Sequence, residues 1–369
     1  MSSKLTFPEI GDWAEELPTP CLIIDEQALD SNLKNMADHL KDTTMKVRPH
    51  YKSYKIPQIA KKQMNLGACG ICCAKVGEAE TLAGVVNDVL IANQVVTKNA
   101  IQRAIALLDK MRLIIAVDNV NNSKILGTYA SDARNEIEVF IEVNIGMNRG
   151  GVLPEDPTVD FAKSISRIEG LKLSGIMGYE GHIIFTKDFE ERKAKAEKCY
   201  KKLVDSKNAL EKAGFECEII SAGGTGTYNI ASAYDGLDEL QAGSYTLMDV
   251  HYTSINPLLP FKQASWVLST VCSTPVEGML SLDAGVKTLG VDQGNPVLPK
   301  GLNIGAFSEE HIQCFFGKKL REKGVKVGDK FLIAPNHGCT TMNLHKNAYI
   351  LNDGKIKEIW EVGGALCSN

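Results

Sequence analysis

The chain has 369 residues, with 41 lysines and arginines against 45 aspartates and glutamates, and a formal net charge of -4 at pH 7. This near-balance leaves no strongly basic face for nucleic acid and no polybasic patch for a membrane surface, so we expect a small-molecule partner. No apolar run approaches the roughly 20 residues that a membrane-spanning helix needs.

The N-terminal stretch, residues 1–17, lacks the charged and apolar regions of a secretory signal peptide. Ten cysteines stand at irregular spacing, and Cys72 and Cys73 are adjacent, which is typical of reduced, buried cysteines in a cytosolic protein. We therefore expect a cytoplasmic location. Residues 20–25, PCLIID, predict a strand, and residues 25–42 predict a helix.

From Lys46 onward, short apolar runs alternate with helical patterns. The runs are apolar throughout, which is typical of parallel strands that are covered on both faces. The expected strands are 46–50, 70–75, 88–94, 112–118, 139–144, 173–180, 217–223 and 240–245, and the clearest helices are 97–111, 157–169 and 188–214. We therefore predict an α/β fold, a (β/α)8 TIM-type barrel. An open doubly wound sheet is the alternative, but its G-x-G-x-x-G fingerprint after the first strand is missing.

After about Ser254 the helical periodicity gives way to strand-like runs at 266–274, 279–285, 330–339 and 348–360. The sequence NDGK at 352–355 is a β-hairpin signal. We predict a barrel over residues 26–255 and a second, C-terminal β-strand domain over residues 256–369. The N-terminal segment 1–25 is expected to join the β domain.

In a barrel of this type the site lies at the C-terminal ends of the strands. The segment RPHYKSYK places Lys52 at such an end, two residues after His50. A partly desolvated lysine favours the neutral amine, which attacks carbonyl carbon, so Lys52 is a candidate Schiff-base residue. A solvated surface lysine is the alternative, so the rest of the chain must supply a cofactor site.

Two glycine-containing segments, SAGGTGTY at 221–228 and QAGSY at 241–245, follow the seventh and eighth predicted strands. Backbone N–H groups at such turns can cradle a phosphate, and the last two strands of barrels commonly do so. A tight turn without a ligand is the alternative. A nucleophilic lysine and a phosphate cradle in one barrel predict a site for pyridoxal 5'-phosphate.

The sequence also resembles a known family. The matching segments are TPCLIID, RPHYKSYK, GACGICCAKVGEAE, VNIGMNRGGV, GGTGTY, ELQAGSYTLMD, LDAGVKTLG and PNHGC. They resemble the D-threonine aldolase and D-serine dehydratase group of the alanine racemase-like, fold-type III pyridoxal phosphate enzymes, over residues from about Pro18 to about Trp360.

The resemblance implies roles for individual residues. It makes Lys52 the Schiff-base lysine and Arg149 the partner of the cofactor's phenolic oxygen. The residues at the phosphate-binding positions are Gly224, Thr225, Gly243 and Ser244. Gln241 would lie near the pyridine nitrogen, where racemases have an arginine, which counts against simple racemisation. His50 would either tune Lys52 or pack under the cofactor.

His337 and Cys339 stand two residues apart in PNHGC, at the end of the strand predicted over 330–339. Side chains at i and i+2 of a strand share a face, so both could ligate one ion, although the spacing alone is weak evidence. The resemblance implies a divalent metal here. Imidazole with thiolate favours zinc, with manganese or magnesium as alternatives.

The resemblance implies a metal-dependent lyase for D-3-hydroxy amino acids, with retro-aldol cleavage of D-threonine-like substrates to glycine and an aldehyde as the leading expectation. A D-serine or D-3-hydroxyaspartate dehydratase is the alternative, because Cys339 stands where dehydratases have cysteine and aldolases usually have aspartate. An amino acid racemase and a non-enzymatic cofactor carrier are further alternatives. The resemblance also implies a homodimer, and leaves open which chain's cofactor His337 serves.

The base that acts on the substrate's β-hydroxyl is left open. A histidine that some family members carry in the loop after the sixth strand falls at Phe185, and His182 stands three residues earlier. His182 is the candidate base, and an ordinary loop histidine is the alternative. Tyr179 closes the sixth predicted strand and is a candidate catalytic and cofactor-binding residue, although an aromatic there could simply wall the pocket.

Overall fold

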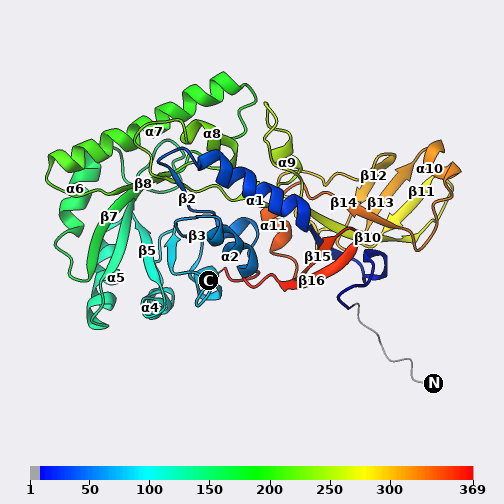
Figure 1. Cartoon of the computed structure of the whole chain (residues 1–369), viewed down its shortest axis with the longest axis horizontal. Coiled ribbons are helices and arrows are strands. Elements are labelled where there is room, and N and C mark those ends of the chain that lie inside the picture. Colours follow the sequence, from blue (N-terminus) through cyan, green and yellow to red (C-terminus); the bar gives the residue numbers. More distant parts are fainter. Residues whose placement is uncertain (1–8, 369) are drawn as a thin grey trace.

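The computed structural model describes residues 9–368 and contains two strand systems (Figure 1). The strands of the first are β2 (Lys46–Val47), β3 (Ile71–Cys73), β4 (Asp88–Ile91), β5 (Arg112–Val117), β6 (Ile137–Glu142), β7 (Leu171–Met177), β8 (Ile219–Ala222) and β9 (Glu239–Leu240). They form one parallel sheet in the order β2-β9-β8-β7-β6-β5-β4-β3. A parallel bridge between His50 and Cys72 joins the continuation of β2 to β3, so the arrangement is consistent with the predicted TIM-type barrel.

Helices follow the strands and cover the outside of this sheet (Figure 1). They are α1 (Glu26–Leu40), α2 (Pro57–Asn65), α3 (Val76–Thr81), α4 (Lys98–Leu107), α5 (Val120–Asp132), α6 (Asp156–Ile165), α7 (Phe189–Lys212) and α8 (Tyr228–Ala231). Side chains at the N-caps fix where several of them begin: Asp25, Thr97 and Asp188 each accept a hydrogen bond from the backbone N–H three residues later. Gly214, with φ +86°, follows the end of α7 as predicted.

The parallel strands are buried on both faces, which explains their continuous apolar runs. One face contributes a buried cluster made of Cys72, Leu90, Ile114, Ala116, Phe140 and Met177. Side chains of the opposite face, such as Val89, Ile115 and Ile141, pack in the larger cluster that includes the helices. Full burial of one such aliphatic side chain stabilises the fold by about 1.5–3 kcal/mol.

The second strand system contains the predicted C-terminal strands. Its members are β1 (Cys21–Asp25), β10 (Ser265–Ser273), β11 (Met279–Leu282), β12 (Leu302–Phe307), β13 (Ile312–Phe316), β14 (Lys330–Ile333), β15 (Asn347–Asn352) and β16 (Lys355–Glu361). The order is β12-β13-β11-β10-β1-β15-β16, with β14 paired to β10. β1 pairs with β10 and β15, so this strand lies in the same sheet as the C-terminal strands, while residues 1–8 of the segment lie outside the described residues.

Two details of this part differ from the prediction. The expected strand 330–339 ends at Ile333, and β12 and β13 were not predicted. The hairpin at NDGK is present, because Asp353 and Gly354 take φ of +50° and +79° between β15 and β16.

Short helices lie where the two strand systems meet (Figure 1). The remaining helical segments are α9 (Val250–Thr253), α10 (Lys318–Glu322), α11 (Gly338–Met342), η1 (Ala14–Glu16), η2 (Tyr51–Ser53), η3 (Thr225–Thr227) and η4 (Ser244–Thr246). The Asp249 carboxylate accepts hydrogen bonds of 2.9 Å from the backbone N–H groups of both Tyr252 and Gly338, so one side chain caps α9 and α11. Within residues 9–368, no helix is both long and apolar enough to cross a bilayer.

Candidate functional site

A cavity of about 280 Å³ opens at the C-terminal ends of the parallel strands and is also lined by residues of α9 and α11. Every site residue predicted from the sequence lines it, with the exception of His182. Those residues are His50, Lys52, Arg149, Tyr179, Gly224, Thr225, Gln241, Gly243, Ser244, His337 and Cys339. The structure therefore brings His50 and Cys339, which are 289 positions apart in the sequence, into one cavity.

Lys52 lies in the 3-10 turn η2 and not at the end of a regular strand, since β2 ends at Val47. The Ser53 hydroxyl donates to the His50 carbonyl at 2.9 Å, which closes this turn. The Lys52 ammonium nitrogen lies 5.6 Å from the centroid of the Tyr179 ring, and the Arg149 guanidinium carbon lies 5.6 Å from the same centroid. A lysine and an arginine side chain thus lie at equal distance from one aromatic ring in the cavity, and burial raises the pKa of that tyrosine.

His50 stands two residues before Lys52, and the charge of Lys52 affects its pKa. Burial lowers the pKa of His50 well below its usual range, and the neighbouring positive charges of Lys52 and Arg149 lower it further. Its ring is therefore neutral near pH 7, and its buried Nδ1 has no hydrogen-bond partner within the described residues.

The turn that carries Arg149 depends on its glycines. Gly151 has φ +94°, and a Cβ at this position would lie 2.7 Å from the Asn144 nitrogen. The Gly151 N–H donates to Asp118 at 2.9 Å, so a side chain at the end of β5 anchors the turn after β6. This explains the glycine at position 151.

The two loops after β8 and β9 are tied to each other. The Thr225 hydroxyl oxygen accepts the Tyr245 backbone N–H at 3.0 Å, which leaves the hydroxyl proton of Thr225 available for another acceptor. A Cβ at Gly243 would lie 2.7 Å from the His50 carbonyl oxygen, so only glycine fits there. Gly224, Thr225, Gly243 and Ser244 of these loops line the cavity, and their N–H and O–H groups are donors of the kind that bind an anion.

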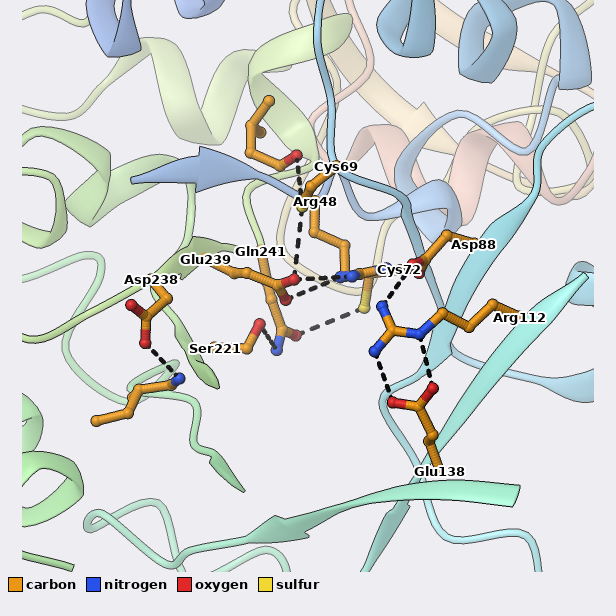
Figure 2. Close-up of polar contacts among 12 residues, drawn as sticks. Arg48, Cys69, Cys72, Asp88, Arg112, Glu138, Ser221, Asp238, Glu239 and Gln241 are labelled. Atoms are coloured by element: carbon orange, nitrogen blue, oxygen red, sulfur yellow. Dashed lines mark hydrogen bonds and ion pairs between the residues drawn. The ribbon is translucent and has the colours of Figure 1, made fainter. Parts of the chain in front are cut away.

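Gln241 is held in place by neighbouring strands (Figure 2). Its side-chain nitrogen donates to the Ser221 hydroxyl at 2.9 Å, and its oxygen accepts from the Cys72 thiol at 3.5 Å. The residue therefore presents a fixed, uncharged amide to the cavity.

A charged network lies near the amino-terminal ends of the same strands (Figure 2). Arg48 is 1% exposed and donates to Glu239 at 2.8 and 2.7 Å and to Asp88. Asp88 also accepts from Arg112 at 2.7 Å, and Arg112 binds Glu138 through two further hydrogen bonds. This network joins β4, β5, β6 and β9 to the residue that directly follows β2.

His337 and Cys339 line the cavity for a different reason from the one predicted. They lie at the start of α11, where His337 is the N-cap, and not on one face of a strand. The His337 Nδ1 lies 2.7 Å from the Asp292 carboxylate. Although burial lowers the pKa of His337, Cys339 and Asp292 raise it to about 9.

The donor set of this pair fits a divalent metal. Imidazole and thiolate are the ligands that zinc prefers, and a carboxylate on Nδ1 orients a histidine to ligate through Nε2. Among residues 9–368, no group of three or more His, Cys, Asp or Glu is placed so as to hold a metal ion. A metal bound by His337 and Cys339 would therefore have coordination positions left for water or substrate. Asp292 was not predicted, because nothing near it in the sequence signals this contact.

His182 does not reach the cavity. Its side chain is exposed and lies over Gly146, because the adjacent Ile183 and Ile184 turn inward and are 4% exposed each. A histidine that was not selected from the sequence, His251 on α9, does line the cavity, and its ring stacks on Phe185 with 3.6 Å between centroids. The local sequence MDVH did not signal this placement, because it depends on backbone hydrogen bonds to residues 335 and 336.

Comparisons with known proteins agree with this arrangement. The family model described as alanine racemase, N-terminal domain, matches residues 24–250, and the putative serine dehydratase domain matches residues 264–351. The chain is 34% identical over 361 residues to a 3-hydroxy-D-aspartate aldolase from Paracoccus denitrificans (strain Pd 1222), covering 94% of this chain and 92% of the relative. It is 31% identical over 360 residues to a D-threonine aldolase from an Arthrobacter species, covering 95% and 94%.

A solved structure matches the fold as well. The crystal structure of D-threonine aldolase from Filomicrobium marinum superposes with a TM-score of 0.94 at 34% sequence identity, covering 99% of this chain and 100% of that chain. The chain is therefore an enzyme of the alanine racemase-like, pyridoxal phosphate-dependent family, and belongs to the group that contains the D-threonine aldolases and D-serine dehydratases.

Proposed function

We propose that this enzyme cleaves D-3-hydroxy amino acids by a retro-aldol reaction and releases glycine and an aldehyde. The observation that carries the proposal is that Lys52 shares one cavity with the glycine-rich loops and with His337 and Cys339. A reactive amine, an anion cradle and a pair of metal ligands are the groups that such a cleavage requires.

The residues of the cavity fit pyridoxal 5'-phosphate. A Cβ at Gly243 would fill the space beside His50, and the buried Nδ1 of His50 has no hydrogen-bond partner among residues 9–368. The phosphate would be held by Gly224, Thr225, Gly243 and Ser244. When bound, the cofactor supplies an aldehyde for the lysine and an electron sink for the substrate's Cα.

The other residues act on the substrate or on the cofactor's orientation. Lys52 carries the reactive amine, and Tyr179 packs beside it. Arg149 supplies a positive charge to the cofactor's phenolic oxygen, and Gln241 offers an uncharged amide to the ring nitrogen. Racemases have an arginine at the corresponding position, so the neutral Gln241 gives the ring nitrogen a different partner, which counts against simple racemisation.

We also propose a divalent metal, with zinc favoured, bound by His337 and Cys339. Such an ion supplies a Lewis acid to the substrate's β-oxygen. In this proposal residues 26–255 form a closed (β/α)8 barrel that binds the cofactor, and residues 256–369 with segment 1–25 form the domain that carries the metal. A homodimer is proposed as well, and light scattering on the purified protein tests it.

Dehydration of D-serine or D-3-hydroxyaspartate is the second candidate function. Cys339 favours it, together with the match of residues 264–351 to a putative serine dehydratase domain. The same cavity could serve both reactions, because loss of hydroxide and cleavage of Cα–Cβ both need a polarised β-oxygen.

Product analysis separates the candidates. The purified enzyme, loaded with pyridoxal 5'-phosphate, is given D-threonine, D-3-hydroxyaspartate or D-serine, with and without a chelator. Glycine with an aldehyde supports the aldolase, whereas an oxo acid with ammonia supports the dehydratase. Turnover that a chelator leaves unchanged contradicts the metal proposal, and formation of the L-amino acid alone supports a racemase.

A further inference from the structure

Three histidines line the cavity, and two of them have already been given a role in the site. His337 lies against Asp292 and Cys339, in the pair proposed to bind metal. His50 lies in the turn that carries Lys52, where burial and positive charge hold its pKa low. The third, His251, has a buried Nδ1 without a hydrogen-bond partner in the described part of the chain.

The position of His251 is fixed by its neighbours. Its backbone N–H donates to the Asn336 carbonyl at 3.3 Å, and the preceding Val250 N–H donates to the Pro335 carbonyl at 3.1 Å. The first turn of α9 is therefore bonded to the two residues that precede His337. Since Asp249 caps both α9 and α11, His251 is held at a constant position relative to the proposed metal ligands.

The ring of His251 is also restrained. It stacks on Phe185 with 3.6 Å between centroids and an interplanar angle of 26°. This contact fixes the plane of the imidazole without engaging either nitrogen. A base needs such placement, because proton transfer requires a defined approach of donor and acceptor atoms.

We propose that His251 is the catalytic base that removes the proton from the substrate's β-hydroxyl. This assignment rests on the retro-aldol function proposed above. The hydroxyl proton moves to the imidazole, the β-carbon–oxygen bond becomes a carbonyl, and the Cα–Cβ bond breaks. The electron pair of that bond stays with Cα, which takes a proton to give glycine, and the imidazolium returns its proton to solvent.

The test compares His251→Gln with His182→Gln, both loaded with pyridoxal 5'-phosphate. The two substitutions are chemically identical, and the exposed His182 lies outside the cavity. We expect His251→Gln to lower kcat for D-threonine cleavage by about 10²- to 10⁴-fold with little change in KM, the range that loss of a general base gives. We expect His182→Gln to stay within about twofold of the unmodified enzyme.

Two further readouts exclude a structural role. Visible absorbance of the lysine-bound cofactor and the bound zinc content should be the same in His251→Gln and in the unmodified enzyme. A His251→Gln enzyme that keeps its kcat, or that loses cofactor or zinc, overturns the assignment of the base. An unmodified enzyme that cleaves neither D-threonine nor D-3-hydroxyaspartate overturns the proposed function, and this assignment with it.

Discussion

Replacing Arg48 with methionine tests whether the charged network below the cavity stabilises the fold. Arg48 is 1% exposed, and its guanidinium is shared between Glu239, which is 4% exposed, and Asp88. The substitution keeps an unbranched side chain but leaves the Glu239 carboxylate buried without its partner. Removal of one member of a buried ion pair costs about 3–5 kcal/mol of unfolding free energy.

Arg112→Met is the matched control, because Arg112 belongs to the same network and makes hydrogen bonds of similar length. Its side chain is 38% exposed, so water screens the loss, and the expected cost is about 1 kcal/mol or less. The two variants should therefore differ by about 2 kcal/mol or more.

Urea unfolding at pH 7, followed by circular dichroism and tryptophan fluorescence without added cofactor, measures this difference. Burial raises the pKa of Glu239, but Arg48 lowers it below its usual value, so the carboxylate is ionised at pH 7. The stabilisation is present above the ordinary glutamate pKa of about 4.3 and is lost as the pH falls through the lower folded value. Equal midpoints for Arg48→Met and Arg112→Met would refute the reasoning.

Combining Arg48→Met with Glu239→Gln should recover most of the loss, because no buried charge is left unpaired.

Three other substitutions, one of them with a matched control, test the site. Gly243→Ala should destabilise the protein by about 1–3 kcal/mol and should weaken cofactor binding, measured by absorbance titration. Gly224→Ala is its control, because a Cβ there meets only Tyr179, at 3.4 Å. This variant should leave the urea midpoint nearly unchanged. Lys52→Ala should abolish the visible absorbance of the lysine-bound cofactor and its fixation by borohydride, and fixation to another residue would contradict the assignment. Asp292→Asn should lower zinc affinity, measured with a competing chelator, by about 10- to 100-fold, because Asp292 orients His337; an unchanged affinity would place the metal elsewhere.

The sequence predicted the parallel strands well because burial on both faces leaves an unbroken apolar run, as in Leu113 to Val117. It did not predict β12 and β13, whose side chains are largely exposed, as in Asn303 and Phe315, so their pattern is weak. The hairpin at 352–355 was evident because Asp353 and Gly354 favour positive φ.

Most of the cavity could be predicted because its residues follow strand ends, and parallel strands place those ends at one edge. His182 was selected because it stands three residues before Phe185, where some family members have a loop histidine, but the burial of Ile183 and Ile184 turns it toward solvent. His251 reaches the cavity through backbone bonds to residues 335 and 336, a long-range contact that no local pattern encodes.

The double cap formed by Asp249 has a consequence for turnover. Its carboxylate and the backbone hydrogen bonds of Val250 and His251 join the segment after β9 to residues 335–338 beside the cavity. These contacts connect the second strand system to the parallel sheet. Swinging the two parts away from each other would break all of these bonds at once. We therefore expect the distance from the Lys52 amine to His337 and Cys339 to stay constant through each catalytic cycle.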